Sequence, residues 1–376
     1  MRPFGYFVHH QGRGHATRCA AVVNALPPER PVTVFCARDD VFPPLREGVE
    51  VRRIPSLFEP SGAPEPPALA AARTPANMHC APLGWAQIRA ATAAMTAWFD
   101  AANPALMIVD VSAEVAQLAR LCSVPVVKVL QHGDRSDDGH LRAYEGCEGL
   151  LAPYAAALEQ PERPGWMRAL THHAPGLGVD AARLPERAAA RRALGIGEGP
   201  LAVVVSGGGG SGAPLAPLAM AARALPDWRI VTIGPVAREG HETEPGNLMH
   251  HGWVDVPETY VAAADLVIAS TGNTACHQIL AAGRPWIAVP EWRYFEEQLH
   301  KGRALHRAGV AHLCETWPGT PHGWRLAVDA ARALDPDRQR RLVDPAAAAG
   351  TARWLTDLAA RLWAPAPAPS LAVAAE

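Results

Sequence analysis

A histidine follows two glycines near the start of the chain, where Gly12, Gly14 and His15 join an apolar segment to a stretch with helical periodicity. The glycines permit a tight turn and the close approach of another molecule. The dipole at a helix start disfavours a protonated imidazole, so the sequence predicts a neutral His15 that can accept a proton. A structural turn with a solvent-exposed histidine is the alternative interpretation. Dinucleotide-binding turns have a third glycine where this chain has Thr17, so the pattern disfavours NAD.

Asp110 ends a strongly apolar segment that has the pattern of a buried strand. Its carboxylate could orient or charge His15 across the neighbouring strand end, or it could simply cap the helix that follows. The next apolar segment is followed by His132, which we expect to line the same pocket. These side chains are the candidates for proton transfer in the first half of the chain.

A second glycine-rich segment joins a strand pattern to a helical pattern between Ser206 and Gly212. Backbone N–H groups in such a loop can face an anion, and phosphate is the usual ligand. The alternative is a flexible connector, which the many glycines at this junction disfavour. No Gly-Lys-Ser/Thr follows, so the loop is not a P-loop. The candidate phosphate-binding residues are Ser206, Gly207, Gly208, Gly209, Gly210 and Ser211.

A third junction, after the apolar segment that begins at Leu266, carries the small polar residues of a helix start. Such residues are typical of a helix cap, and the free N–H groups of the first turn attract anions. The residues are Thr271, Gly272, Asn273 and Thr274. Together with the glycine-rich loop, this helix start could hold both phosphates of a diphosphate.

The elements that would position these residues alternate between short apolar strands and helical patterns, which is typical of parallel sheets with crossover helices. The loops after such strands are where ligands bind. The alternation occurs twice, so we expect an α/β protein of two Rossmann-like domains that face a cleft. The predicted boundaries are a first domain over 1–165, a linker over 166–180, a second domain over 181–344, a helix over 345–363 and a disordered tail over 364–376.

Composition narrows the classes of partner. The 376 residues carry a formal net charge of −2, which removes the general argument for a nucleic-acid partner. The seven cysteines include no Cys-x-x-Cys pair, so we expect reduced thiols and no zinc site built from cysteine. The sequence contains no apolar run long enough for a membrane span and no signal peptide, which predicts a cytoplasmic protein. The oligomeric state is left open.

The turn at Gly12, Gly14 and His15 resembles the amino-terminal loop of glycosyltransferases related to the peptidoglycan N-acetylglucosaminyltransferase. The stretch 201–313 resembles the carboxy-terminal nucleotide-sugar domain of glycosyltransferase family 28. The motifs that carry this second resemblance are His250-His-Gly-Trp253-Val254, Ala263-Ala-Asp265, Thr271-Gly-Asn-Thr274, Ala281-Ala-Gly283-Arg-Pro285, Val289-Pro290 and Glu297-Gln298.

The resemblance implies a GT-B fold in which the second domain holds a nucleoside-diphosphate sugar, with uridine as the expected base, and the first domain holds the acceptor. By the same resemblance, backbone at Trp253 and Val254 faces the base, and Glu297 and Gln298 contact the sugar hydroxyls. Family members usually have a glutamate against the ribose where this chain has Gln278, and an amide loses the strength of a charged acceptor.

The expected reaction is inverting transfer of the sugar, with His15 as general base, Asp110 as its helper, and the helix start at Asn273 stabilising the departing diphosphate. No acidic cluster of the Asp-x-Asp kind is apparent among these motifs, so we expect no required metal and no other cofactor. His132 and Trp85 are the candidates for acceptor contact.

Three alternatives remain at this point. The same scaffold hosts nucleotide-sugar hydrolases and epimerases, and the Gly-x-Gly-His turn also resembles that of a nucleotide-sugar hydrolase of pseudaminic acid synthesis. A non-catalytic nucleotide-sugar-binding protein is a further reading. Weak peripheral membrane contact is conceivable through Met78 to Trp85 and the helix carrying Trp98 and Phe99, although an ordinary core helix is the simpler interpretation.

Overall fold

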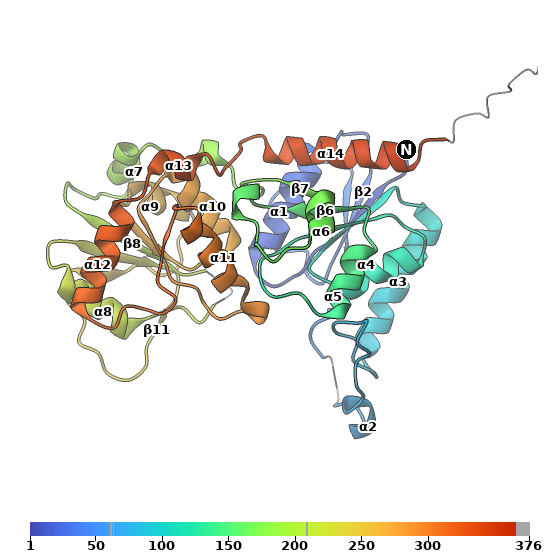
Figure 1. The fold of residues 1–376 in the computed structure, drawn as a ribbon, viewed down its shortest axis with the longest axis horizontal. Helices are drawn as coiled ribbons and strands as arrows, with labels where there is room; N and C mark the ends of the chain where they lie inside the picture. Colours follow the sequence, from blue (N-terminus) through green and yellow to red (C-terminus); the bar gives the residue numbers. More distant parts are fainter. Residues whose placement is uncertain (61, 63, 208–209, 366–376) are drawn as a thin grey trace, which may run out of the picture.

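The computed structural model describes residues 1–60, 62, 64–207 and 210–365. Two domains lie side by side along the long axis of the molecule, each built on one parallel sheet with helices on its faces (Figure 1). The predicted α/β architecture of two Rossmann-like domains is therefore confirmed. Gly208, Gly209 and most of the predicted disordered tail fall outside the described residues.

The first domain contains a seven-stranded sheet of order β3-β2-β1-β4-β5-β6-β7 in which every pairing is parallel. The central strands are buried throughout because helices cover both faces, which is why their sequences are continuous apolar runs. The strands are β1 Phe4–Phe7, β2 Val32–Cys36, β3 Val49–Arg53, β4 Leu106–Asp110, β5 Val126–Val129, β6 Gly149–Ala152 and β7 Thr171–His173. The helices are α1 Arg13–Ala25, α2 Pro67–Ala70, α3 Ala86–Ala102, α4 Ala113–Leu121, α5 Asp138–Glu145, the 3-10 helix η1 Ala156–Leu158 and α6 Gly165–Leu170.

The second domain contains a six-stranded parallel sheet of order β12-β10-β8-β13-β14-β15 and a separate two-stranded ribbon. The sheet strands are β8 Leu201–Val205, β10 Arg229–Ile233, β12 Leu248–His250, β13 Leu266–Ala269, β14 Trp286–Ala288 and β15 His312–Leu313, and the ribbon pairs β9 Ala213–Pro214 with β11 Val236–Ala237. The helices are η2 Ala181–Arg183, α7 Arg187–Ala193, α8 Leu215–Ala224, α9 Pro257–Ala263, α10 Asn273–Ala282, η3 Tyr294–Glu296, α11 Glu297–Arg307, α12 Pro321–Arg332 and α13 Pro336–Arg340.

The last helix, α14 (Ala347–Leu362), returns to the first domain and lies along α1 (Figure 1). Leu355 and Leu358 are buried in the core of that domain, and Trp363 donates a hydrogen bond from Nε1 to the Ala105 carbonyl at 3.0 Å. The predicted helix is thus present, although Pro345 lies just before the first turn rather than in it. This crossing packs α14 against the domain in which the chain begins.

The predicted linker over 166–180 begins too early. Residues 165–173 form α6 and β7, and β7 pairs with β6 as the outer strand of the first sheet. The prolines and glycines of this segment led to the prediction of a linker, although the segment contains a short helix followed by a three-residue strand. Two further elements, α5 and β6, were also missed because each is short.

The helix considered for membrane contact packs inward instead. Trp98 and Phe99 on α3 are buried in the core, and the Trp98 ring meets Phe35 edge-on at 5.3 Å. These two side chains are therefore not available for membrane contact, whereas Met78 and Leu83 in the preceding loop are exposed. Within the described ranges, no helix has the length and apolar character needed to cross a bilayer.

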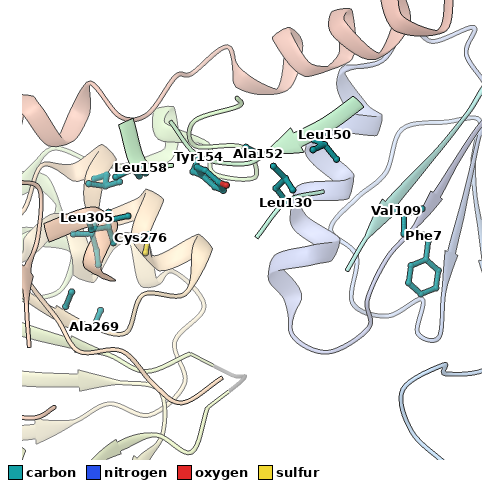
Figure 2. Close-up of a cluster of buried hydrophobic side chains, with 14 of the residues drawn as sticks. Phe7, Val109, Leu130, Leu150, Ala152, Tyr154, Leu158, Ala269, Cys276 and Leu305 are labelled. Carbon is teal, nitrogen blue, oxygen red and sulfur yellow. The ribbon is translucent and has the colours of Figure 1, made fainter. Parts of the chain in front are cut away.

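Buried contacts run from one domain into the other. Leu158 of η1 and Leu305 of α11 belong to the same hydrophobic cluster (Figure 2), and η1 contacts α11 directly. The backbone N–H of Asp134 donates to the Phe295 carbonyl at 2.8 Å, and the Arg135 guanidinium lies 4.6 Å from the centre of the Phe295 ring. The loop after β5 is thus fixed against the start of α11.

Candidate active site

His15, Asp110 and Arg18 form a connected group at the carboxyl ends of β1 and β4. His15 Nδ1 lies 3.1 Å from Asp110 Oδ1, and Arg18 Nη2 lies 2.6 Å from Asp110 Oδ2. Gly12 makes the turn before α1 with a positive φ of 73°, which favours glycine, and the helix then begins with His15 in its first turn. The predicted partnership of His15 with Asp110 is therefore present in the structure.

The surroundings of Asp110 determine which nitrogen of His15 is basic. Burial opposes ionisation of Asp110, but the charge of Arg18 and the hydrogen bonds to Arg18 and His15 outweigh it and hold the carboxyl pKa well below its usual range. Nδ1 also lies 2.9 Å from Arg18 Nη2, which can only donate, so two partners compete for this nitrogen. We assign the imidazole hydrogen to Nδ1, donating to Asp110, because an ionised carboxylate only accepts hydrogen bonds and Arg18 Nη2 already donates to Asp110 Oδ2 at 2.6 Å. Nε2 then carries the lone pair that can take a proton.

Replacing Arg18 with leucine should destabilise the protein by about 3–5 kcal/mol near neutral pH, because the buried Asp110 would lose its counter-charge. In the variant, burial raises the folded-state pKa of Asp110 above the unfolded value, so stability is lost as pH rises. In the wild type, the depressed pKa of Asp110 stabilises the folded state at pH values above the ordinary carboxyl pKa, and this stabilisation is lost in acid. Urea unfolding at several pH values should show a deficit that shrinks in acid. A deficit independent of pH would contradict this assignment.

His15 lies at the wall of a cavity between the two domains, of about 160 Å³. Its lining residues are Gln11, Gly12, Gly14, His15, Arg18, Leu130, Gln131, His132, Pro153 and Tyr154 of the first domain and Asn273, Thr274, Glu297 and Lys301 of the second. Whole-ligand pockets are typically about 300–1,000 Å³. The cavity therefore encloses the groups around one reacting centre rather than a complete nucleotide sugar.

The second domain contributes to this cavity a wall of hydrogen-bond donors that can bind an anion, here called the anion-binding wall. Asn273 and Thr274 begin α10, whose N-cap Gly272 has no side chain to satisfy the first-turn N–H groups. Lys301 of α11 is buried beside them and donates from Nζ to Asn273 Oδ1 at 2.8 Å. Among the described residues, no carboxylate lies within ion-pair distance of Lys301, so its charge is available to a negatively charged ligand.

Two further predicted residues line the same cavity. Glu297 begins α11 and lies 3.3 Å from Arg135 Nη2 across the domain junction. His132 is fully buried, and its Nε2 lies 2.8 Å from the Leu158 carbonyl oxygen. Burial and the nearby charge of Lys301 lower the pKa of His132 well below its usual value, so its ring is neutral. The cavity wall thus combines a neutral imidazole with a carboxylate already paired to arginine.

The other predicted residues do not line the cavity. Trp85 lies at the start of α3, Trp253 is exposed after β12, and Val254 and Gln278 are half-buried. Gln298 has a bracing position instead, since its Oε1 accepts from the backbone N–H groups of Thr271 and Glu291 at 3.2 and 2.9 Å. Its side-chain oxygen therefore holds the loops after β13 and β14 together.

The glycine-rich loop also differs from expectation. Ser206 is buried and accepts from the Ala213 N–H at 3.1 Å, and the ribbon strand β9 separates the loop from α8. Gly207 and Ser211 are exposed, and Gly210 packs against Glu291. The loop is therefore not the N-terminus of a helix, and none of its described residues lines the cavity. Gly208 and Gly209 are not described.

Sequence reasoning missed two residues of the site, although each leaves a signal. Arg18 follows His15 by three positions, which places both side chains on one face of α1. Lys301 follows Glu297 by four positions on α11 and is one of only two lysines in the chain. Spacing of this kind indicates that two side chains share one face of a helix. Only the structure shows that these faces of α1 and α11 meet at one cavity.

No protein-family model matches the sequence, and no curated protein matches it either. Solved structures do match over nearly the whole chain. The glycotransferase of kitacinnamycin is 17% identical with a TM-score of 0.64, covering 96% of this chain and 99% of its own. MurG of Acinetobacter baumannii is 14% identical with a TM-score of 0.60, covering 94% and 99%. The calicheamicin glycosyltransferase CalG4 is 17% identical with a TM-score of 0.64, covering 97% and 100%. The chain therefore has the GT-B fold of these glycosyltransferases.

Proposed function

We propose that the protein is a metal-independent, inverting glycosyltransferase that moves a sugar from a nucleoside-diphosphate sugar, with uridine as the expected base, to an acceptor bound by the first domain. One observation carries this proposal. A basic imidazole from one domain and a cationic, anion-binding wall from the other line the same small cavity. Transfer needs both a base for the acceptor and a stabiliser for the departing diphosphate.

At the acceptor end, His15 Nε2 takes the hydroxyl proton as the acceptor oxygen attacks the anomeric carbon. The resulting imidazolium is stabilised by the ionised Asp110, which lies 3.1 Å from Nδ1. The neighbouring His9 adds no positive charge, because burial and the nearby His15 and His10 lower its pKa to about 3. The new bond forms on the face opposite the departing group, so the configuration at this carbon inverts.

At the donor end, the bond between the anomeric carbon and the diphosphate oxygen breaks with both electrons leaving on oxygen. Lys301 and the first-turn N–H groups of α10 face this developing charge. This fixed positive charge is the protein's substitute for a divalent ion at the phosphates. Glu297 lines the same wall, and in this proposal it accepts hydrogen bonds from sugar hydroxyls.

Acceptor binding by the first domain is supported by a second, larger hollow of about 550 Å³ beyond the carboxyl ends of β1, β2 and β3. His10 lines it and stacks on His9, whose ring centre lies 5.6 Å from that of His15. Arg38, Arg53 and Glu59 give it a polar wall. An acceptor there could extend its reacting hydroxyl toward His15.

Uridine diphosphate should raise the midpoint of thermal unfolding more than guanosine or thymidine diphosphate at the same concentration. A ligand that binds only the folded state stabilises it by about 2.7 kcal/mol at one hundred times its dissociation constant. Differential scanning fluorimetry over a concentration series measures this directly. A larger shift with another diphosphate would change the assigned base. No shift with any of them would contradict the nucleotide-sugar proposal.

A further inference from the structure

A second group of ionisable side chains lies at the domain junction, apart from the cavity. His140 Nδ1 lies 2.6 Å from Asp137 Oδ2, and His79 Nδ1 lies 3.7 Å from Asp137 Oδ1. One potential ligand atom from each of the three residues falls within 4.8 Å of the others. None of the three lines the cavity assigned to sugar transfer.

We propose that His79, Asp137 and His140 bind a divalent first-row transition-metal ion of the zinc type. Two imidazoles and one carboxylate form a donor set that suits such ions, with bonds of about 2.0–2.2 Å and water completing the coordination. Asp137 already stands between the two imidazoles, with one oxygen toward each ring. An ion would replace the hydrogen between His140 and Asp137, and small side-chain movements would bring all three ligands to bonding distance.

The backbone around these ligands is fixed before any ion arrives. Asp137 is the N-cap of α5, and its Oδ1 accepts from the His140 N–H at 3.1 Å. Glu114 Oε1 accepts from the backbone N–H groups of His79 and Cys80 at 2.9 and 2.7 Å, which holds the loop carrying His79. Gly139 lets that loop approach, because a Cβ there would collide with the His79 backbone. Such outer contacts orient metal ligands in proteins.

The site is open to an ion on one side and covered on the other. The side chains of Asp137 and His79 are 42% and 32% exposed, whereas His140 is 4% exposed. The Phe295 ring of the second domain lies 5.1 Å from the His79 ring and 5.0 Å from the His140 ring. An ion can therefore enter from solvent and bind beneath an aromatic cover supplied by the other domain.

Cobalt(II) provides the probe, because its visible spectrum reports histidine and carboxylate coordination in place of zinc. Titration of the metal-free, full-length protein should develop one saturable visible band at one equivalent, and added zinc should abolish it. His79→Ala and Asp137→Asn should each lose this band, and asparagine still caps α5. His306→Ala removes a histidine from the His306–His312 pair, which forms no ion pair with a carboxylate of the described residues, and it should keep the band.

Absence of the band in the wild type, or its persistence in both His79→Ala and Asp137→Asn, would overturn the proposal. The three residues would then serve only as a hydrogen-bonded cap of α5. Circular dichroism and the unfolding midpoint would show that each variant is folded. Glu114→Gln keeps all three ligands but weakens the hold on the His79 loop, so its cobalt affinity should fall by about 10–100-fold. The readout is spectroscopic, so it is independent of sugar transfer.

Discussion

Replacing His15 with alanine should lower the rate of sugar transfer by about 10²–10⁴-fold, the usual contribution of a general base. The variant would keep the anion-binding wall of the second domain, so its dissociation constant for the nucleoside diphosphate should stay close to that of the wild type. The physical reason is that His15 contacts Asp110 and Arg18 rather than any residue of that wall. Initial rates and calorimetric titration, measured on the same preparation, separate the two effects.

His9 provides the matched control for this experiment. Its ring lies 5.6 Å from that of His15, but its Nδ1 accepts from the Gln11 N–H at 3.1 Å and the side chain does not line the cavity. His9→Ala should therefore change the rate little. Full transfer activity in His15→Ala, with normal nucleotide binding, would show that another group removes the acceptor proton.

Replacing Lys301 with methionine should lower kcat by about 10²–10³-fold, the size of effect seen when one preorganised stabiliser of a developing negative charge is removed. Methionine is apolar and has a similar length, so the buried position stays filled while the charge is lost. Because the same charge faces the ground-state diphosphate, the affinity for the nucleotide should fall as well. Steady-state kinetics and calorimetry on the variant test both parts.

Arg303 is the matched control on the same helix. Its guanidinium is exposed and paired with Glu315 at 2.8 Å, away from the cavity. Arg303→Met should therefore leave kcat and nucleotide affinity nearly unchanged. Equal losses in the two variants would indicate a general effect of charge on α11, and unchanged kcat in Lys301→Met would remove Lys301 from the mechanism.

The sequence predicted the architecture because its strands are buried on both faces and therefore read as continuous apolar runs. Leu106–Asp110 and Leu201–Val205 are examples. The elements that escaped prediction are short: β7 has three residues and lies among prolines and glycines. Its strand character depends on pairing with β6, which is a tertiary effect.

The candidate site was predicted unevenly for a related reason. Asp110 ends β4 and His15 follows β1, its neighbour in the sheet, so the adjacency of the two strand ends was enough to bring them together. Lys301 lies on α11, just after the Glu297-Gln298 motif. Its position beside Asn273 depends on how α11 packs against α10. Conversely, Gln298 follows Glu297 directly but points to the loops it braces, because adjacent residues of a helix face different directions.

In the proposed reaction the two walls of the cavity act together, and acceptor-dependent release of the nucleoside diphosphate tests this most directly. The protein would be incubated with nucleotide sugars, with and without pooled small-molecule acceptors, and the products identified by mass spectrometry. We predict that diphosphate release requires acceptor, yields a glycosylated product and nearly disappears in His15→Ala. Free sugar or an altered nucleotide sugar, formed at the same rate without acceptor, would contradict transfer and identify a hydrolase or an epimerase.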